Sequence, residues 1–472
     1  MCIVPAFFVS LDALKGGEMA KKQIFGTDGI RTTANVYPLT PESAVKVGKA
    51  VTRWFQKKDP AKKIVAAIGT DTRISSEMLS AAVSAGIMSA GGNITDLKVV
   101  STPLVSDFVR TNKCDFGIVI SASHNPFDDN GIKIFNSKGE KLNDSQELEI
   151  EALFFDETGA ENPVGDKIGT ARIAENPEFD YVSRIVKAFE TLKDSEIKIC
   201  IDCANGATAK IAKKIFSAFP KMEKFFFFTE ANGVNINDNC GALHPENLAP
   251  KILEHNCFAG FAYDGDGDRL ITVDELGRVV DGDKIIGIIA KYLSKNGKLA
   301  HNSAAVTVMS NAGLEKHLKN CGIALERTDV GDRYLVERIN EKGLSLAGEN
   351  SGHLIIKEIN PTGDGIVASL MILKILAESG KKLSDLADEI ELFPQIQAKV
   401  KITGEKTPIE EIPGLCELIK SQEALLEGGR MLVRYSGTEP VMRVMAEGPD
   451  SAKVQNAVDT VADFVKKSDS EK

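Results

Sequence analysis

The sequence predicts an α/β protein built from several domains. Its 472 residues are too many for one hydrophobic core, so we expect roughly three or four domains. An apolar, strand-like run at 62–73 enters a polar loop and is followed by a helix-like segment at 76–92. Strands that alternate with helices form parallel or mixed sheets with helices on their faces.

The plan of strand, polar loop and helix recurs along the chain, at 116–126, 197–219 and 257–277. Another apolar stretch broken by a polar loop follows at 345–357. Ligands of such folds bind beyond the carboxyl ends of the strands, which is where these polar loops should lie. The tail from about residue 393 has strand-like runs and an amphipathic last helix, so it predicts a small α+β domain behind a hinge near 387–395.

Composition excludes several functional classes. Hydrophobic residues make up 43% and charged residues 26%, as in an ordinary soluble protein, and the net charge of -10 argues against a nucleic-acid partner. Eight scattered cysteines fit a reducing cytoplasm, and the CxxC at 200–203 lacks the second pair of a zinc site, so core thiols are expected. No apolar run reaches the roughly 18 residues of a membrane span, so no membrane partner is expected.

Residues 1–18 are expected to be a start-site extension outside the fold. The segment "MCIVPAFFVSLDAL" is apolar but short, carries Asp12 and lacks a basic start, so it does not fit a signal peptide. Met19 opens "MAKKQIFGTDGI", which has the character of a normal start. We therefore expect residues 1–18 to be dispensable for folding and activity.

The stretch "DGDGDR" (264–269) is a candidate metal site. Asp264, Asp266 and Asp268 stand at alternate positions, and carboxylates this close repel one another unless a cation neutralises them. Oxygen ligands suit Mg²⁺ or Ca²⁺. An EF-hand does not fit, because Arg269 stands where that loop needs glycine and strand-like runs flank the stretch. Mg²⁺ is therefore favoured, with an acidic surface turn as the alternative.

Two further loops suit a phosphosugar. "RYSGTEPVMR" (434–443) sets two arginines around hydroxyl and glycine residues, which predicts an anion cradle or, alternatively, a plain turn between strands. "GENSGH" (348–353) offers alternating polar side chains that suit sugar hydroxyls, although a tight turn with a satisfied histidine fits as well. "FGTDGIR" (25–31) and "VGDRYL" (330–335) are weaker signals of the same kind.

The most polar loop is "SASHNPFDDNGIK" (121–133), directly after the strand-like "GIVI". It lacks the GxSxG elbow of a serine nucleophile, and nothing marks a catalytic triad. Ser123 is therefore either a turn residue or a carrier of phosphate, and a phosphoserine beside Mg²⁺ is an activated phosphoryl donor. Together with a phosphate cradle and a sugar loop, this predicts transfer of a phosphoryl group between two positions of a phosphosugar.

The motifs "SASHNP", "DGDGDR", "GENSGH" and "RYSGTEP", in this order, resemble those of the α-D-phosphohexomutase superfamily. The resemblance covers nearly the whole chain, from about Ile24 to the last helix. It implies four domains around a central cleft: three related mixed α/β domains and a C-terminal TATA-box-binding-protein-like α+β domain. The expected domains are 19–170 with the phosphoserine loop, 171–278 with the metal-binding loop, 279–392 with the sugar-binding loop and 393–472 with the phosphate-binding loop.

The resemblance also implies a role for each motif residue. Ser123 would be the phosphoserine, and its phosphate would hold Mg²⁺ together with Asp264, Asp266 and Asp268. Three residues would line the reaction centre as charge stabilisers or proton shuttles: Arg31, Lys133 and His353. The sugar hydroxyls would contact Glu349 and Ser351. The non-reacting phosphate would be held by Arg434, Ser436, Gly437, Thr438 and Arg443.

Within the superfamily the chain looks most like the bacterial phosphoglucosamine mutases, through "VGDRY" (330–334), "TGDGI" (362–366) and "RVMAEG" (443–448). It departs from their pattern at Asn350, where glutamine is usual, at Thr32, where glycine is usual, and at 127–128, where an aromatic pair is common.

This resemblance implies interconversion of glucosamine 6-phosphate and glucosamine 1-phosphate through a 1,6-bisphosphate, feeding UDP-N-acetylglucosamine synthesis. It implies Mg²⁺ as cofactor, glucosamine 1,6-bisphosphate or another hexose 1,6-bisphosphate as activator, a small phosphosugar as partner, and a monomer or homodimer. The alternatives are a phosphomannomutase/phosphoglucomutase and a phosphoserine-dependent phosphatase. The phosphate cradle argues against the phosphatase, because a hydrolase has no need to grip a second phosphate.

Overall fold

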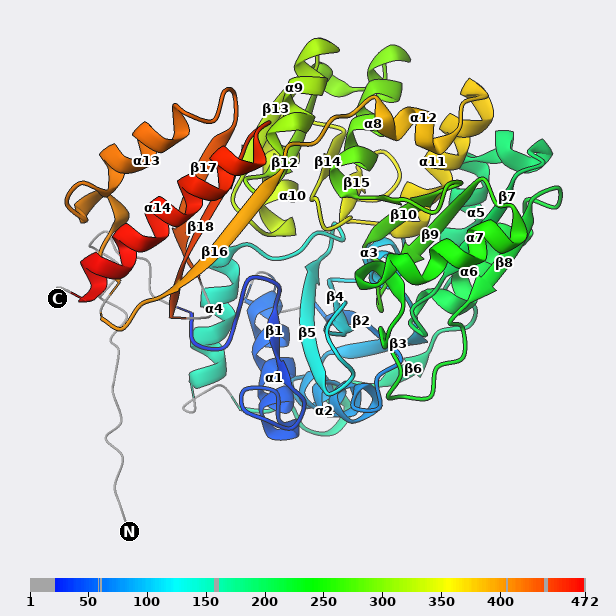
Figure 1. Ribbon diagram of the computed structural model, residues 1–472. Coiled ribbons are helices and arrows are strands. Elements are labelled where there is room, and N and C mark those ends of the chain that lie inside the picture. The colour runs from blue at the N-terminus through cyan, green and yellow to red at the C-terminus, as the bar shows by residue number, and fades with distance from the viewer. Residues whose placement is uncertain are drawn as a thin grey trace.

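The computed structural model describes residues 22–57, 59, 62–156, 161–404, 406–436 and 440–470. Four sheets follow one another along the chain, each with helices from its own part of the sequence (Figure 1). The expected extension at residues 1–18 lies outside the described residues, as do Gly437 and Thr438. Within the described part, none of the helices has the length and apolar character that crossing a membrane requires.

The first sheet is mixed and has six strands in the order β1-β5-β4-β2-β3-β6. Its strands are β1 (Ile30–Thr33), β2 (Val65–Thr70), β3 (Asn93–Val99), β4 (Phe116–Ile120), β5 (Asp129–Asn136) and β6 (Ala171–Ile173). Its helices are α1 (Pro41–Gln56), α2 (Ser76–Ser89), α3 (Thr102–Thr111) and α4 (Asp144–Phe155). Strand β4 is parallel to β2 but antiparallel to β5, so the loop between β4 and β5 starts at the carboxyl end of a parallel strand.

The second sheet has five strands in the order β11-β10-β9-β7-β8. Its strands are β7 (Lys198–Asp202), β8 (Glu223–Phe227), β9 (Ala259–Tyr263), β10 (Leu270–Asp274) and β11 (Val279–Val280). Its helices are α5 (Phe179–Ala188), α6 (Thr208–Ser217) and α7 (Ala249–His255). The prediction that the CxxC cysteines are core residues is confirmed: Cys200 on β7 and Cys203 just after it are fully buried.

The third sheet has four strands in the order β13-β12-β14-β15. Its strands are β12 (Ser303–Thr307), β13 (Ala324–Thr328), β14 (Leu346–Gly348) and β15 (Leu354–Ile356). Its helices are α8 (Gly282–Lys295), α9 (Ala312–Asn320), α10 (Asp332–Lys342), α11 (Gly365–Ser379) and α12 (Leu383–Asp388). Each of the first three sheets thus combines parallel strands with an antiparallel hairpin whose loop follows a parallel strand: β4–β5, β9–β10 and β14–β15.

The expected helix after the polar loops of 116–126 and 257–277 is wrong. Both loops return directly into antiparallel strands, β5 and β10. The residues that follow the loops read "GIKIF" and "LITVD", short runs rich in β-branched side chains that are buried in the sheet. These runs are too short to form a helix and fit a strand instead.

Apolar packing divides the chain into a large body and a smaller domain. One continuous cluster of buried side chains runs from Val105 of α3 through Phe261 of β9 to Leu370 of α11. The first sheet also has a cluster of its own, which includes Phe116. The C-terminal domain has a separate cluster that includes Val444 and Val458. The first three units therefore pack as one body, whereas the last keeps its own core.

The C-terminal domain is an antiparallel sheet in the order β16-β18-β17 with a long helix across it (Figure 1). Its elements are β16 (Gln395–Lys401), α13 (Leu415–Glu423), β17 (Arg430–Tyr435), β18 (Val441–Glu447) and α14 (Ser451–Ser470). Residues of α14 at helical spacing, such as Val454, Val458 and Val461, are buried. The predicted strands and amphipathic last helix are thereby confirmed.

A buried carboxylate fastens this domain to the third sheet. Glu447 is fully buried; its Oε1 accepts from Arg430 Nε and from the Ala312 N–H at the start of α9 at 3.0 Å. Gln395 Nε2 donates to the other oxygen at 3.0 Å. Arg430 Nη2 also donates to the carbonyl oxygen of Ser310 at 2.7 Å. The hydrogen bonds to Ala312 and Ser310 cross from the C-terminal domain to the body of the molecule, and those with Arg430 and Gln395 hold Glu447 in place within its own domain.

Glu447→Ala should destabilise the protein by about 3–5 kcal/mol, because it removes a fully buried carboxylate and leaves a partly buried arginine and a helix N–H without that partner. Chemical denaturation followed by circular dichroism measures the loss. The matched control is Glu427→Ala, which removes an exposed carboxylate paired with Lys453 in the same domain and should barely move the midpoint. Equal midpoints for the Glu447 variant and the native protein would contradict the assignment.

Candidate active site

The hairpin loops of the first three sheets meet at one place. They are the loops 121–128, 264–269 and 349–353. Ser123 Oγ of the first loop donates to Asp264 Oδ2 of the second. Arg269 and His353 form an isolated antiparallel bridge between the second and third loops. The structure therefore brings together three of the four motifs that the sequence singled out.

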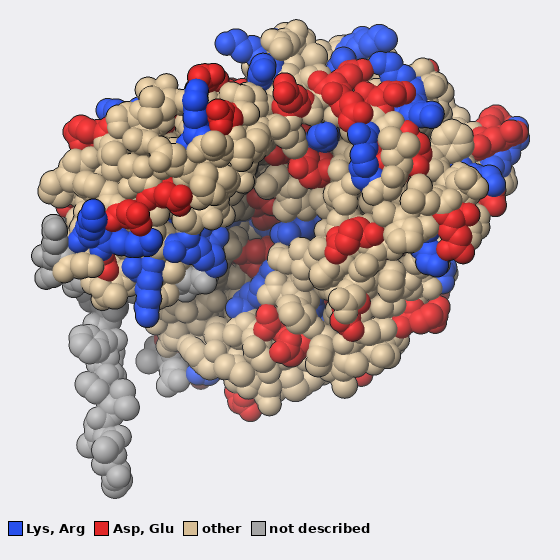
Figure 2. All heavy atoms as spheres, in the orientation of Figure 1, with Lys and Arg blue, Asp and Glu red and all other residues tan. Residues whose placement is uncertain are grey.

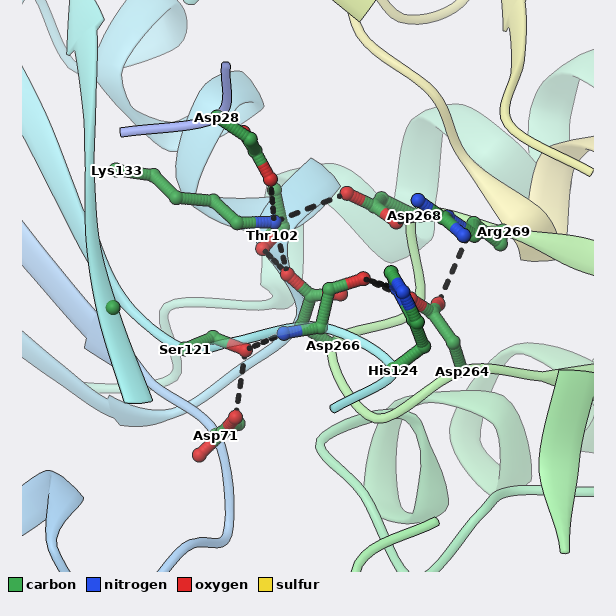
Figure 3. A network of polar contacts seen from close by, with 12 residues as sticks. Asp28, Asp71, Thr102, Ser121, His124, Lys133, Asp264, Asp266, Asp268 and Arg269 are labelled. Atoms are coloured by element: carbon green, nitrogen blue, oxygen red, sulfur yellow. Dashed lines mark hydrogen bonds and ion pairs between the residues drawn. The ribbon is translucent and has the colours of Figure 1, made fainter. Parts of the chain in front are cut away.

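Ser123 is buried and held in an unusual backbone conformation. Its φ of 54° lies in the left-handed region, which costs a non-glycine residue about 1–2 kcal/mol. The Ser123 N–H donates to Ser121 Oγ at 2.9 Å, and Ser121 in turn donates to Asp71 Oδ2 at 2.6 Å (Figure 3). Ser123 Oγ lies 2.5 Å from Asp264 Oδ2 and 3.4 Å from His124 Nδ1. The hydroxyl is therefore directed at the carboxylates rather than at solvent.

Asp264, Asp266 and Asp268 form a buried cluster in which one oxygen of each lies within 4.8 Å of the others. Burial, and then the charges of Asp268 and Asp266, raise the pKa of Asp264 well above its ordinary value. Burial also acts to raise the pKa of Asp268, but Lys133, His353 and Lys141 together outweigh it and hold that pKa well below its ordinary value. Such a cluster gains stability from an additional cation.

The donor atoms of the cluster fit a divalent cation. Asp266 Oδ1 and Asp268 Oδ1 are buried and, among the described residues, have no hydrogen-bond partner. Their Oδ2 atoms face Lys133 Nζ at 2.8 and 3.2 Å. An unsatisfied buried acceptor costs about 1–3 kcal/mol or more, and hard carboxylate oxygens are the ligands that Mg²⁺ prefers. The residues present therefore fit Mg²⁺.

Glycines bring the metal loop close to Ser123. A Cβ at Gly265 would lie 2.7 Å from the Ser123 carbonyl oxygen, and Gly267 has a φ of 76°. Thr102 at the start of α3 fixes the loop, since its N–H donates to Asp266 O at 2.9 Å and its hydroxyl to Asp266 Oδ2 at 2.6 Å. The Asp-Gly-Asp-Gly-Asp pattern is therefore a steric requirement as well as a charge pattern.

Lys133 is the cation at the centre of the network. Besides the two aspartates, its Nζ lies 3.3 Å from Asp28 Oδ2. Burial lowers the pKa of Lys133, but the charges of Asp266, Asp268 and Asp28 outweigh it and raise the pKa well above its ordinary value. Lys133 therefore stays protonated. Asp28 also accepts from Arg31 Nη2 at 2.5 Å, which places Arg31 at the same centre.

His353 joins the third loop to this network. The buried ring has Nδ1 at 3.9 Å from Asp268 Oδ2 and Nε2 at 3.8 Å from Asp332 Oδ2. Burial lowers the pKa of His353, but Asp268 and Asp332 outweigh it and raise the pKa above its ordinary value. Lys141 Nζ contacts both Asp28 and Asp332, so it links the first and third units next to His353.

Glu349 and Ser351 lie on the same loop as His353. Ser351 Oγ donates to Glu349 Oε2 at 3.1 Å, and the Glu349 N–H donates to His353 O at 2.9 Å. Two polar side chains of one loop thus lie side by side at the edge of the charged network.

The fourth motif lies at the β17–β18 hairpin of the C-terminal domain. Arg434 and Arg443 are direct cross-strand partners, and Lys399 on β16 is opposite Arg443. Opposed residues share one face of a sheet, so these side chains form a basic row, and like charges so placed are unfavourable without an anion. Burial and the charge of Arg443 lower the pKa of Arg434. Ser436 is buried at the end of β17. Figure 2 shows basic side chains of this domain beside a hollow near the centre of the molecule.

Several residues of the site were not predicted. Asp28 and Asp332 belong to "FGTDGIR" and "VGDRYL", which the sequence marked as weak signals only. Lys141 lies in no motif. Arg269 closes "DGDGDR", and its N–H donates to Asp264 Oδ1 at 3.0 Å. An aspartate next to glycine is the signal that the two weak stretches share with "DGDGDR" and that could have identified them.

Asp266→Asn should weaken Mg²⁺ binding, because it removes one negative charge and one ligand from the site. Loss of a residue that only supports a metal ligand lowers metal affinity about 10–100-fold, so the loss of affinity here should be at least that large. Isothermal titration with Mg²⁺ measures the change. Asp238→Asn, an exposed aspartate of the same sheet region, is the matched control and should bind Mg²⁺ as the native protein does. Unchanged affinity in the Asp266 variant would remove the basis of the metal assignment.

Comparison with known proteins agrees with this geometry. Four segments match the models of phosphoglucomutase/phosphomannomutase alpha/beta/alpha domains I, II and III and of the C-terminal domain, at residues 22–161, 179–277, 281–393 and 397–464. The phosphoglucosamine mutase of Syntrophotalea carbinolica is 42% identical over 450 residues, 95% of this chain and 98% of that protein. That of Streptococcus agalactiae is 44% identical over 94% of this chain and 98% of its own length.

Solved structures share the fold at lower identity. A phosphoglucomutase/phosphomannomutase family protein of Burkholderia thailandensis has a TM-score of 0.76 at 23% identity, with 94% of this chain and 97% of that chain covered. The Aspergillus fumigatus N-acetylphosphoglucosamine mutase, in complex with GlcNAc-6P and magnesium, has a TM-score of 0.67 at 18% identity, with 95% and 96% covered. The predicted fold class and superfamily are confirmed: the chain belongs to the phosphoglucomutase/phosphomannomutase family and is a phosphosugar mutase of the α-D-phosphohexomutase superfamily.

Proposed function

We propose that the chain is a phosphoglucosamine mutase that interconverts glucosamine 6-phosphate and glucosamine 1-phosphate. One observation carries the proposal: the buried Ser123 hydroxyl faces a triad of carboxylates where the loops of three sheets meet. Relatives that are 42–44% identical over nearly the full length are phosphoglucosamine mutases. Asp332 of "VGDRY", a stretch that resembles that branch, also lies in the charged centre beside His353.

The reaction uses Ser123 as a covalent carrier. The bond between phosphorus and Ser123 Oγ of the phosphoserine breaks while a bond forms to O1 of glucosamine 6-phosphate, which makes glucosamine 1,6-bisphosphate. This intermediate turns over within the cleft, and its 6-phosphate returns to Ser123 Oγ, which leaves glucosamine 1-phosphate. Added glucosamine 1,6-bisphosphate or another hexose 1,6-bisphosphate would activate enzyme that has lost its phosphate.

The charged network supports each transfer. The Lys133 ammonium and the Arg31 guanidinium stabilise negative charge on the moving phosphoryl group. His353, held between two carboxylates, gives or takes the proton of the sugar hydroxyl. Mg²⁺, held by the phosphate of Ser123 with Asp264, Asp266 and Asp268, would withdraw charge from the phosphoryl oxygens.

Substrate binding divides between two loops. Glu349 and Ser351 hold the sugar hydroxyls, and the non-reacting phosphate is held by Arg434, Ser436, Gly437, Thr438 and Arg443. Because the intermediate must present either phosphate to Ser123, this second site has to accept two orientations. A hinge near 387–395, ahead of the domain with its own core, would let the cleft close over the bisphosphate and open for release. The proposal includes four domains, which span residues 19–170, 171–278, 279–392 and 393–472. It also includes a monomeric or homodimeric state and a cytoplasmic location.

Phosphorus NMR of the protein with Mg²⁺ and glucosamine 6-phosphate tests the proposal. Glucosamine 1-phosphate should appear, and faster than the 1-phosphates of glucose or mannose from their 6-phosphates. Ser123→Ala should lower turnover by on the order of 10⁶-fold, as removal of a covalent nucleophile does elsewhere, while Ser217→Ala on the exposed face of α6 should not change it. A faster reaction with mannose or glucose phosphate would favour the phosphomannomutase/phosphoglucomutase alternative, and release of inorganic phosphate would favour a phosphatase.

A further inference from the structure

Arg73, from the stretch "GTDTR" after β2, is outside every motif used so far, yet its side chain is fully buried behind the Ser123 loop. A guanidinium has five N–H donors, and all of them are used here. Nε donates to Asp71 Oδ2 at 2.8 Å. The remaining four donors point to backbone carbonyl oxygens of the loop: Ser123 at 3.0 Å, Asn125 at 2.8 Å, Asp129 at 3.0 Å, and Pro126.

Asp71 extends the same support to the other side of Ser123. Its Oδ2 accepts from Ser121 Oγ at 2.6 Å, and Ser121 Oγ accepts from the Ser123 N–H at 2.9 Å (Figure 3). Its Oδ1 accepts from the Arg73 N–H at 3.0 Å and from Ser76 Oγ at 2.9 Å. The N–H and the C=O of Ser123 are therefore both tied to the Asp71–Arg73 pair.

The second sheet region adds a smaller clamp on the same atoms. Asn237 Nδ2 donates to the carbonyl oxygens of Ser123 at 2.9 Å and Asn125 at 3.1 Å. Each of these carbonyls thus accepts two hydrogen bonds, one from Arg73 and one from Asn237. Turning four carbonyls of one short loop toward a single buried guanidinium requires an irregular backbone, and Ser123 adopts the left-handed φ of 54°.

We infer that Arg73 is a positioning residue for phosphoryl transfer, which holds the Ser123 loop so that Oγ faces the carboxylate triad and the substrate. The inference rests on the proposed function and extends it to a residue that contacts the Ser123 loop through backbone carbonyl oxygens of that loop. Lysine keeps the charge at this position but has three donors on one nitrogen, so it cannot reproduce the planar fork that reaches four carbonyls. In Arg73→Lys the loop should relax and Ser123 Oγ should lose its alignment.

Steady-state kinetics of Arg73→Lys on glucosamine 6-phosphate provide the test. Each enzyme is first incubated with glucose 1,6-bisphosphate until intact mass shows equal phosphorylation. We expect kcat to fall about 10²-fold, as a displacement of about 1 Å can cause, with KM within about threefold, because the phosphate and sugar loops are untouched. A purely structural role would lower the melting temperature without changing kcat measured well below it.

Two variants keep the outcome decisive. Ser121→Ala removes the acceptor of the Ser123 N–H together with the hydrogen bond from Ser121 Oγ to Asp71, and leaves Arg73 in place. It should lower kcat about tenfold, the effect of losing one hydrogen bond to Ser123, even if Arg73→Lys does not fold. Arg278→Lys is the matched control, since Arg278 Nε also donates to an aspartate at 2.8 Å but lies at a half-exposed turn, and its kcat should equal that of the native enzyme.

Native-like kcat in folded Arg73→Lys overturns the inference, and so does native-like kcat in Ser121→Ala if Arg73→Lys does not fold. A rise in KM alone overturns it too. An inactive native enzyme would instead reject the proposed function.

Discussion

The organisation of the site depends on burying three carboxylates next to the Ser123 hydroxyl. Asp264, Asp266 and Asp268 repel one another away from solvent, and this is tolerable only because cations surround them. Lys133 neutralises one side of the cluster, while two carboxylate oxygens have no hydrogen-bond partner in the described part of the chain and fit a metal ion. The surrounding loops, glycines and ion pairs are arranged to satisfy this one electrostatic constraint.

The constraint also explains why the site lies between sheets rather than within one. Ser123, Asp264 and His353 come from hairpin loops of three different sheets, and one continuous cluster of buried side chains connects the three units. That shared core holds the reacting groups in a fixed relation. The basic row of Arg434 and Arg443 belongs to the domain with a separate core, joined to the body by contacts such as that of Glu447 with α9. A rigid reaction centre and a more independent phosphate-binding domain suit an intermediate that must be enclosed, turned over and released.

The sequence predicted the parts that are coded locally. Alternating strands and helices indicated the α/β class, and the polar loops at strand ends contained Ser123, the three aspartates and His353. It failed where function depends on contacts between distant segments. Asp28, Lys141 and Asp332 come from segments far apart in the chain, and no local sequence pattern predicts that they contact one another. Arg73 lies 50 residues before the loop that it supports. The antiparallel returns at β5 and β10 were missed because periodicity alone does not separate a short apolar strand from a buried helix segment, and the length of the runs, which favours strands, was not used.

The central claim is that Ser123 carries the transferable phosphate, and phosphopeptide mapping of the native protein tests it most directly. Intact mass before and after incubation with glucosamine 6-phosphate gives the phosphorylated fraction, and peptide mass spectrometry locates the phosphate. The account predicts one phosphate, located on Ser123. Incubation with glucosamine 6-phosphate should remove it, because some of the bisphosphate intermediate escapes from the enzyme. Glucose 1,6-bisphosphate should restore it. A phosphate on another residue, or mutase turnover by protein that never carries phosphate at Ser123, would contradict it.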